Sequence, residues 1–379
     1  MRHIYLDYNA TTPIAPSVQE AMLPFLAEHY GDPSSSHALG RACLEALEDA
    51  RGRVAGLLGC EDEEVVFTSG GTEANNLALK GVMLNGGAVG DGHLVISALE
   101  HPAVTEPARY LERLGFDVTV VRGNVDGVVE PDDVAAALRP DTRLVSIMHA
   151  NDVIGTVQPL RRIAKICRAR GVLLHTDAVQ SVGKIRAAVD ELDVDLLSLS
   201  AHKFYGPKGV GALYVRHGVP LESLLHGAGN EGGMRAGTEN VPHIVAMGRA
   251  ASLTAKSLDQ AAERLTMLRE KLLKRLRETL GEQLTVNGCR AERLPNTLSV
   301  NFPRVSGQAL LARIPELCAS PGECHGDHGG TSGALSAIGL PAQVAAGTVR
   351  LCVGWYTSEE QVDRAASLLI AAWEDLISR

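Results

Sequence analysis

The sequence predicts an α/β fold in which a mainly parallel sheet is flanked by helices and is followed by a smaller α+β domain. Between residues 64 and 215, short runs of aliphatic and β-branched residues alternate with amphipathic segments, a pattern typical of a sheet covered on both faces. Polar side chains follow several of these runs, and open α/β sheets bind their ligands at such strand ends. After about residue 250 the alternation ends, and leucines at helical spacing replace it.

The elements of the larger domain are expected in the following order. A short extended segment ends in the turn formers of residues 9–13, and helices follow at 16–28 and 40–58, the second ended by Gly59. Strands are predicted at residues 64–68, 93–97, 117–121, 143–148, 172–176, 194–199 and 209–215. Helices that connect them are predicted at residues 102–114, 131–138 and 160–170.

The C-terminal part is predicted to combine long helices with a few strands. Leucines from Leu258 to Leu280 recur every three or four residues with charges between them, which indicates a helix packed on the core rather than a cofactor-binding feature. Strands are expected at 297–302 and 351–353, and a closing helix at 358–377. The glycine-rich loop at 227–240 is too long for a hairpin, and such loops are commonly functional or mobile.

Composition excludes several classes of protein. The chain has 379 residues, is 45% hydrophobic and carries a formal net charge of −9 without any dense run of Lys and Arg, so general nucleic-acid binding is not expected. No apolar stretch reaches membrane-spanning length, and no signal-peptide core follows the first residues. Seven scattered cysteines favour reduced thiols and a cytoplasmic protein. Three of them lie in apolar contexts and are expected in the core: Cys43, Cys167 and Cys352.

Two neighbouring strand ends predict a cofactor site. Asp177 follows the strand at 172–176, and Lys203 follows the strand at 194–199. Pyridoxal 5'-phosphate (PLP) requires a lysine that forms a Schiff base and a carboxylate at its pyridinium nitrogen. Taken singly, a capping aspartate and a surface lysine explain these residues better. The pair, combined with a phosphate-type turn, favours PLP.

That turn is the run of small residues from Ser69 to Thr72. Small residues after a strand, with a hydroxyl at the start of a helix, leave backbone N–H groups free to bind a phosphate. An ordinary helix N-cap is the alternative interpretation. Nucleotide binding is not expected, because the turn has neither a Walker lysine nor the Rossmann glycine spacing. We expect five polar residues at strand ends to meet along one edge of the sheet: Thr72, His101, Asp152, Asp177 and Lys203.

A second unusual segment is the glycine-rich stretch around Cys324. The neighbouring His325, Asp327 and His328 are potential metal ligands, but their spacing does not match the usual zinc patterns, so no metal site is expected. A nucleophilic thiol on a mobile loop is the second interpretation, because nearby imidazoles raise the thiolate fraction. A buried inert cysteine is the third, and the density of glycines argues against it.

Five segments of the chain match the motifs of a known family. They are residues 5–12 (YLDYNATT), 68–76 (TSGGTEANN), 175–180 (HTDAVQ), 200–209 (SAHKFYGPKG) and 235–238 (RAGT). Over essentially its whole length, the chain resembles the NifS/IscS-type cysteine desulfurases of the class V aminotransferase family. The resemblance implies PLP fold type I, as in aspartate aminotransferase. It also implies a large PLP-binding domain at 15–255, and a small domain made of 1–14 and 256–379 that carries the cysteine loop.

The resemblance implies a role in cofactor binding for each candidate. Lys203 would hold PLP as a Schiff base and later move the Cα proton, and Asp177 would keep the pyridine nitrogen protonated. His101 would stack on the ring and transfer protons, a task for which an imidazole is well suited. Gln180 would hydrogen-bond the ring hydroxyl. The residues implied at the phosphate are Gly71, Thr72, Ser200 and His202, joined by Thr238 from the partner in a homodimer.

The resemblance also implies the reaction. Arg350 would bind the carboxylate of L-cysteine in a fork. Cys324 would attack the substrate sulfur, which gives L-alanine and an enzyme persulfide that serves a sulfur-acceptor protein. In the wider family such acceptors serve iron–sulfur assembly, tRNA thiolation, DNA phosphorothioation and selenium delivery. No membrane partner and no direct nucleic-acid partner is expected.

Two departures from the family pattern bear on the substrate. Where the family has Asn-Asn-Glu, residues 151–153 read NDV, and Asp152 places a negative charge beside the expected substrate carboxylate. The Cys324 loop is more similar to that of selenocysteine lyases. A selenocysteine lyase or another PLP-dependent C–S lyase is therefore the alternative function. A non-catalytic scaffold is the other alternative, and the retained Lys203, Asp177 and Cys324 argue against it.

Overall fold

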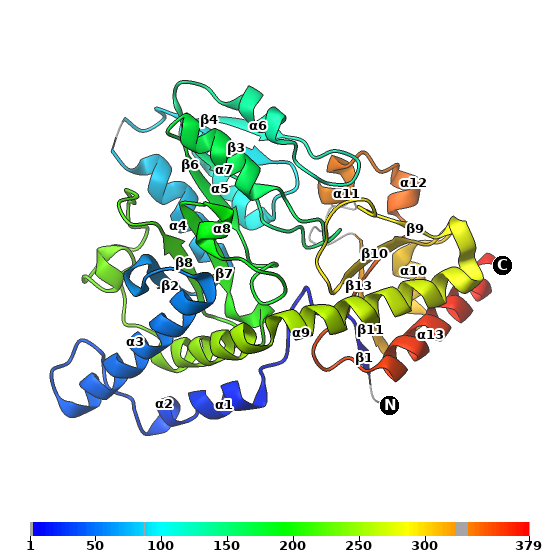
Figure 1. Cartoon of the computed structure of the whole chain (residues 1–379), viewed down its shortest axis with the longest axis horizontal. Helices are drawn as coiled ribbons and strands as arrows, with labels where there is room; N and C mark the ends of the chain where they lie inside the picture. Colours follow the sequence, from blue (N-terminus) through cyan, green and yellow to red (C-terminus); the bar gives the residue numbers. More distant parts are fainter. Residues whose placement is uncertain (1–2, 87, 323–332, 379) are drawn as a thin grey trace.

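The computed structural model describes residues 3–86, 88–322 and 333–378. A seven-stranded sheet forms the centre of its larger part (Figure 1). In spatial order the strands are β2 (Val65–Thr68), β8 (Gly211–Val215), β7 (Leu196–Ser200), β6 (Leu173–Asp177), β5 (Thr142–Ser146), β3 (His93–Ser97) and β4 (Asp117–Val121). Neighbours from β7 to β4 pair in parallel, and β8 is antiparallel to both β7 and β2. The predicted fold class is therefore confirmed.

Helices cover both faces of this sheet because successive side chains of a strand point to opposite faces. Val66, Leu94 and Leu196 pack on one face, whereas their neighbours Val95 and Leu197 pack on the other. The first face is covered by α4 (Gly71–Leu84) and α5 (Pro102–Arg113). The second is covered by α3 (Ala38–Leu58), α6 (Pro131–Ala137), α7 (Leu160–Ala169), α8 (Val189–Leu192) and the start of α9 (Val241–Leu280). Parallel strands covered on both sides are expected to be apolar on both faces.

Two helices differ from the prediction. The helix expected at 16–28 is divided into α1 (Pro16–Met22) and α2 (Pro24–Ala27), because Pro24 has no N–H and begins a new helix. Helix α9 is 40 residues long and begins before the predicted leucine stripe. Its first part packs on α3 and α1, and its last part packs on α13 (Glu359–Ile377). This one helix therefore joins the two parts of the molecule.

The smaller part contains an antiparallel sheet in the order β12 (Ser320–Pro321), β13 (Thr348–Cys352), β10 (Thr297–Asn301) and β9 (Thr285–Val286). Short helices α10 (Gly307–Ala312), α11 (Gly333–Ala337) and α12 (Ala342–Ala345) belong to the same region. Strand β1 (Ile4–Tyr5) pairs in parallel with β11 (Leu317–Cys318), so the N-terminal segment packs with the C-terminal part. We propose that this part is the small domain expected at 1–14 and 256–379.

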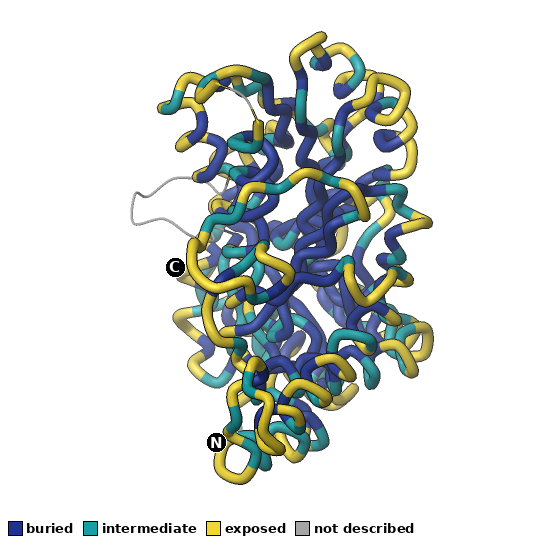
Figure 2. The backbone as a smooth tube through the Cα atoms, turned by 90° about the vertical axis from the view of Figure 1, so that its left-hand side faces the viewer, coloured by how far each residue is buried: buried dark blue, intermediate teal, exposed yellow. Residues whose placement is uncertain are grey.

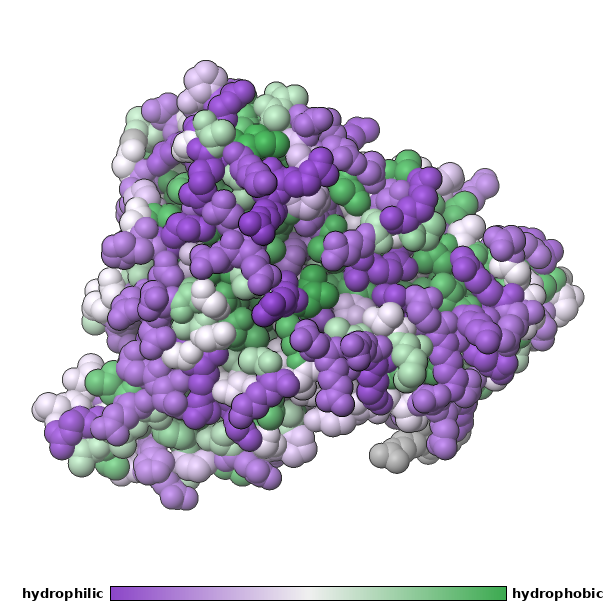
Figure 3. Space-filling model, in the orientation of Figure 1, coloured by the Kyte–Doolittle hydropathy of each residue, from purple (hydrophilic) through white to green (hydrophobic). Residues whose placement is uncertain are grey.

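Burial follows this architecture. Buried segments lie in the interior around the strands, and exposed segments form the outer loops (Figure 2). Hydrophilic residues dominate the face seen in Figure 3, with smaller apolar patches between them. Cys43, Cys167 and Cys352 are buried as predicted. Within the described ranges, every helix is too short or too polar to pass through a lipid bilayer.

Candidate active site

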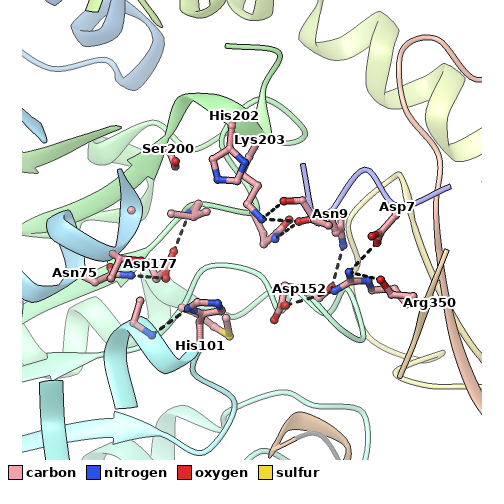
Figure 4. A pocket seen from close by; sticks show the side chains of 18 of the residues that line it. Asp7, Asn9, Asn75, His101, Asp152, Asp177, Ser200, His202, Lys203 and Arg350 are labelled. Carbon is pink, nitrogen blue, oxygen red and sulfur yellow. Dashed lines mark hydrogen bonds and ion pairs between the residues drawn. The ribbon is translucent and has the colours of Figure 1, made fainter. Parts of the chain in front are cut away.

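A cavity of about 540 Å³ lies at the carboxyl ends of β6 and β7 and extends to β13 of the smaller sheet (Figure 4). Parallel strands place the residues that follow them at one edge, which brings together segments far apart in the sequence. All five polar residues predicted to meet there line the cavity. The sequence-predicted residues in its wall are Gly71, Thr72, His101, Asp152, Asp177, Gln180, Ser200, His202, Lys203 and Arg350.

Lys203 reaches the cavity through a single turn of 3₁₀ helix that follows β7. Its Nζ donates hydrogen bonds to the carbonyl oxygens of Asn9 and Ala10, at 2.6 and 2.9 Å. Burial lowers the pKa of this amine. A lysine whose ammonium form is disfavoured is more readily a nucleophile and a base, which suits attachment to an aldehyde.

Asp177 ends β6 and is buried. Its Oδ2 accepts a hydrogen bond from Asn75 Nδ2 at 2.7 Å, and its Oδ1 accepts one from the Val179 N–H at 2.9 Å. Burial raises the pKa of this carboxyl group. Neither hydrogen-bond donor carries a charge, so the carboxylate is not neutralised by them. A cationic ring N–H, such as the pyridinium of PLP, supplies the charge that this position needs.

The start of α4 forms another part of the cavity wall. Gly70 has φ 149° and ψ −179°, a conformation that only glycine adopts readily. At Gly71 a Cβ atom would lie 2.6 Å from Val179 Cγ2, so this position also requires glycine. The turn exposes the first N–H groups of α4, and the Thr72 and Ser200 side chains line the cavity beside it. Helix N-termini of this kind bind phosphate, so the turn fits the phosphate of PLP.

His202 lies on the same side. Its Nδ1 is 3.2 Å from Thr11 Oγ1. Burial, together with the charges of Lys203 and Lys208, lowers the pKa of the imidazole to about 4. The neutral ring can donate one N–H to an anion without adding a charge to the site.

His101 is the N-cap of α5. Its Nδ1 accepts a hydrogen bond from the Ala103 N–H at 3.0 Å, so the proton of the neutral ring is on Nε2. In the view of Figure 4 the ring lies between Asp177 and Asp152. The helix start therefore fixes both the orientation and the tautomer of this imidazole.

Arg350, from β13, forms the end of the cavity nearest the smaller sheet. The residue is only 3% exposed. Its Nη2 lies 2.8 Å from Asp7 Oδ1, and its Nη1 lies 3.2 Å from the carbonyl oxygen and 3.5 Å from Oδ2 of Asp152. A guanidinium can hold a carboxylate in a bidentate pair. Here it is already contacted by two carboxylates of its own chain.

Several residues at or next to this site have no role predicted from the sequence, chiefly Asn9 and Lys184. Asn9 Oδ1 accepts hydrogen bonds from Lys184 Nζ and Asn296 Nδ2, both at 3.0 Å. Asn9 Nδ2 donates to Thr297 Oγ1 at 2.9 Å and to the Asp152 carbonyl at 3.0 Å. The only sequence signal was indirect, since Asn9 belongs to a motif segment.

Two predicted site residues are not among the described residues that line the cavity. Thr238 lies in the glycine-rich loop and lines other hollows, beside Glu231 and Glu239. Its role in a partner's site stays a prediction. Cys324 falls within residues 323–332, outside the described part of the chain, so its role also stays a prediction.

Comparisons with known proteins give consistent matches. The family model described as aminotransferase class-V matches residues 4–365. The curated cysteine desulfurase IscS of Dictyoglomus turgidum is 45% identical over 371 residues, covering 97% of this chain and 94% of that protein. That of Anaeromyxobacter dehalogenans is 47% identical over 369 residues, covering 96% and 91%.

Solved structures agree with these matches. A NifS-like protein superimposes with a TM-score of 0.91 at 38% identity and covers 100% of both chains. A structure described as SspA in complex with cysteine has a TM-score of 0.82 at 35% identity, covering 93% of this chain and 99% of that one.

Proposed function

This chain belongs to the class-V aminotransferase family and is a PLP-dependent cysteine desulfurase, and we propose that the cavity at the ends of β6 and β7 is its active site. The observation that carries the proposal is the placement of Lys203 and Asp177. Adjacent strands deliver an amine of lowered pKa and a buried carboxylate to one cavity. The relative solved with cysteine supports L-cysteine as the substrate and L-alanine as the product.

The proposal gives each wall of the cavity one part of the cofactor. Lys203 is the point of attachment for the aldehyde, Asp177 pairs with the ring nitrogen, and Gln180 pairs with the ring hydroxyl. Bound PLP supplies an electron-withdrawing ring that makes the Cα–H bond of the amino acid acidic. The phosphate is assigned to Gly71, Thr72, Ser200 and His202, with Thr238 contributed by the partner in a homodimer.

The protein's own side chains would carry out proton transfer, substrate binding and sulfur transfer. Lys203 Nζ, which donates hydrogen bonds to two carbonyl oxygens, would accept the Cα proton. His101 orients its Nε2–H by anchoring Nδ1 to the Ala103 N–H, and can exchange that proton with the substrate. Arg350 binds the substrate carboxylate, in competition with Asp7 and Asp152. Cys324 accepts the sulfur as a persulfide, from which an acceptor protein in the cytoplasm takes it.

Two variants test the proposal. The wild-type protein loaded with PLP should show the visible absorption band of a protonated Schiff base. Lys203→Ala should lose this band and all alanine formation. Cys324→Ser should keep the band and lose sulfide release, whereas Cys289→Ser, at an exposed cysteine, should match the wild type.

Two results would count against the proposal. A Lys203→Ala protein that still holds PLP covalently would overturn the site, and a fully active Cys324→Ser protein would overturn the persulfide step. Alanine release from selenocysteine alone, with cysteine untouched, would favour the selenocysteine lyase instead. Product analysis with both amino acids, with and without reductant, separates these outcomes.

A further inference from the structure

Lys184 is a buried amine next to the active site that the proposed reaction does not use. The residue is 5% exposed. Its Nζ donates to Gln180 Oε1 at 2.7 Å and to Asn9 Oδ1 at 3.0 Å. Both acceptors are neutral amide oxygens, so neither bond is an ion pair. Burial, with the nearby charge of Lys203, lowers the pKa of this amine to about 7.

The two hydrogen bonds fix the orientation of two amides. A side-chain amide has one accepting end and one donating end. Because Lys184 donates, Gln180 and Asn9 must each present the oxygen to it and direct the NH₂ group elsewhere. An uncharged amine still has two N–H bonds, so loss of the ammonium proton leaves both contacts in place.

The NH₂ groups of Gln180 and Asn9 donate to carbonyl oxygens that also contact Lys203 and Arg350. Gln180 Nε2 donates at 3.0 Å to the carbonyl oxygen of Asn9, the same oxygen that accepts the hydrogen bond of Lys203 Nζ at 2.6 Å. Asn9 Nδ2 donates to the carbonyl of Asp152, which in turn contacts Arg350. The amide of Gln180 therefore has its NH₂ beside the Lys203 amine, at the wall of the cavity.

We propose that Lys184 is a positioning residue that locks the Gln180 amide with its NH₂ group toward the cavity, as a donor for the ring hydroxyl oxygen of PLP. The inference rests on the proposed function. The reversed amide would set its carbonyl oxygen against an electron-rich oxygen of the cofactor, which is unfavourable. Without Lys184, the Gln180 amide oxygen loses its donor, and only the hydrogen bond from Gln180 Nε2 to the Asn9 carbonyl oxygen still favours the binding orientation.

A double-mutant cycle tests this role. Apo-proteins of the wild type, Lys184→Met, Gln180→Ala and the double variant are titrated with PLP, and the dissociation constant is read from the absorbance of the bound cofactor. Lys184→Met should weaken binding about tenfold, equivalent to about 1.4 kcal/mol. The double variant should bind no more weakly than Gln180→Ala alone, because Lys184 acts through Gln180. Lys165→Met, at an exposed lysine of α7, is the matched control and should bind as the wild type.

Distinct results separate the possible failures. The positioning role would be overturned if the fold-losses in PLP affinity of the two single variants multiplied in the double variant. It would also be overturned if Lys184→Met bound PLP with wild-type affinity. If Lys184→Met does not fold, Lys184→Leu, which also removes the donor, replaces it in the same cycle and is judged by the same criterion. Wild-type PLP binding by both Gln180→Ala and Lys203→Ala would instead contradict the proposed function.

Discussion

The two ends of the cavity are built on different principles. The cofactor end, made of Asp177, Lys203, Ser200 and His202, stands on neighbouring strands of one sheet, and Asp177 and Lys203 are held by uncharged groups. The substrate end, made of Arg350, Asp7 and Asp152, is gathered from a strand of the other sheet, the N-terminal segment and the loop after β5. Its charged groups contact one another.

The difference bears on how each ligand binds. At the proposed cofactor end both hydrogen-bond donors to the buried Asp177 carboxylate are uncharged, so an arriving cationic ring would add an ion pair at this carboxylate. At the substrate end the guanidinium already has acidic neighbours. A substrate carboxylate must therefore displace one of these carboxylates or bind beside it against charge repulsion. The gain in binding free energy is then smaller than for an unpaired guanidinium.

Removing the charge of Asp177 should have the largest effect. Asp177→Asn keeps the size of the side chain but cannot hold a pyridinium by charge, so we expect a roughly 10³-fold fall in kcat for alanine formation. The fold should not suffer, because burial of the charged carboxyl group is unfavourable, as its raised pKa indicates. Steady-state kinetics and a melting curve of the apo-protein measure both. Activity within tenfold of the wild type would show that the cofactor end does not depend on this charge.

Removing the charge of Asp152 should have a smaller and opposite effect at the substrate end. Asp152→Asn leaves the backbone contact to Arg350 and removes one competing carboxylate, so the KM for L-cysteine should fall about fivefold, or about 1 kcal/mol. The absorbance of bound PLP should stay unchanged, which serves as the internal control. A raised KM would mean that Asp152 contributes to substrate binding and that the two ends are more alike than described.

The last effect concerns the stability of the fold rather than the reaction, at Glu100, directly before His101. Its Oε1 accepts hydrogen bonds from Ser97 Oγ at 2.5 Å and from the Met148 N–H at 2.8 Å, which ties the ends of β3 and β5 together. Burial raises the pKa of Glu100 from 4.5 to about 8. The folded protein thus keeps this proton at pH values where the unfolded chain has lost it, and wild-type stability falls as the pH rises through this window.

Glu100→Gln cannot titrate and keeps an accepting oxygen. Its advantage in unfolding free energy over the wild type should therefore grow between about pH 4.5 and pH 8, to on the order of 5 kcal/mol, and level off above. Urea denaturation of the apo-proteins at several pH values measures this difference. An advantage that does not change with pH would mean that Glu100 is not the group that titrates.

The cofactor end was predictable from the sequence and the substrate end only in part. Asp177 directly follows one apolar run and Lys203 comes shortly after the next, so strand periodicity alone put them at one edge of a sheet. Asn9 and Lys184 are 175 positions apart, and no local pattern indicates that their side chains meet. The same limit applies to Asp7, whose contact with Arg350 spans 343 positions.

The differences between the predicted and the observed helices have local physical causes. The start of α9 at Val241 lacked the regular leucine spacing on which the prediction relied, and its burial against α3 replaces that signal. Pro24 marks the break between α1 and α2, because proline is common at the first position of a helix and α2 begins there. The prediction instead continued one helix through this proline.

The pairing of β1 with β11 carries a consequence for biosynthesis. Asp7 emerges from the ribosome 343 residues before Arg350, and β1 likewise emerges long before β11. At typical elongation rates the early segment waits tens of seconds for its partners. A nascent chain halted before residue 317 would therefore carry Lys203 and Asp177 on a finished sheet, yet lack the strand that docks its own N-terminus.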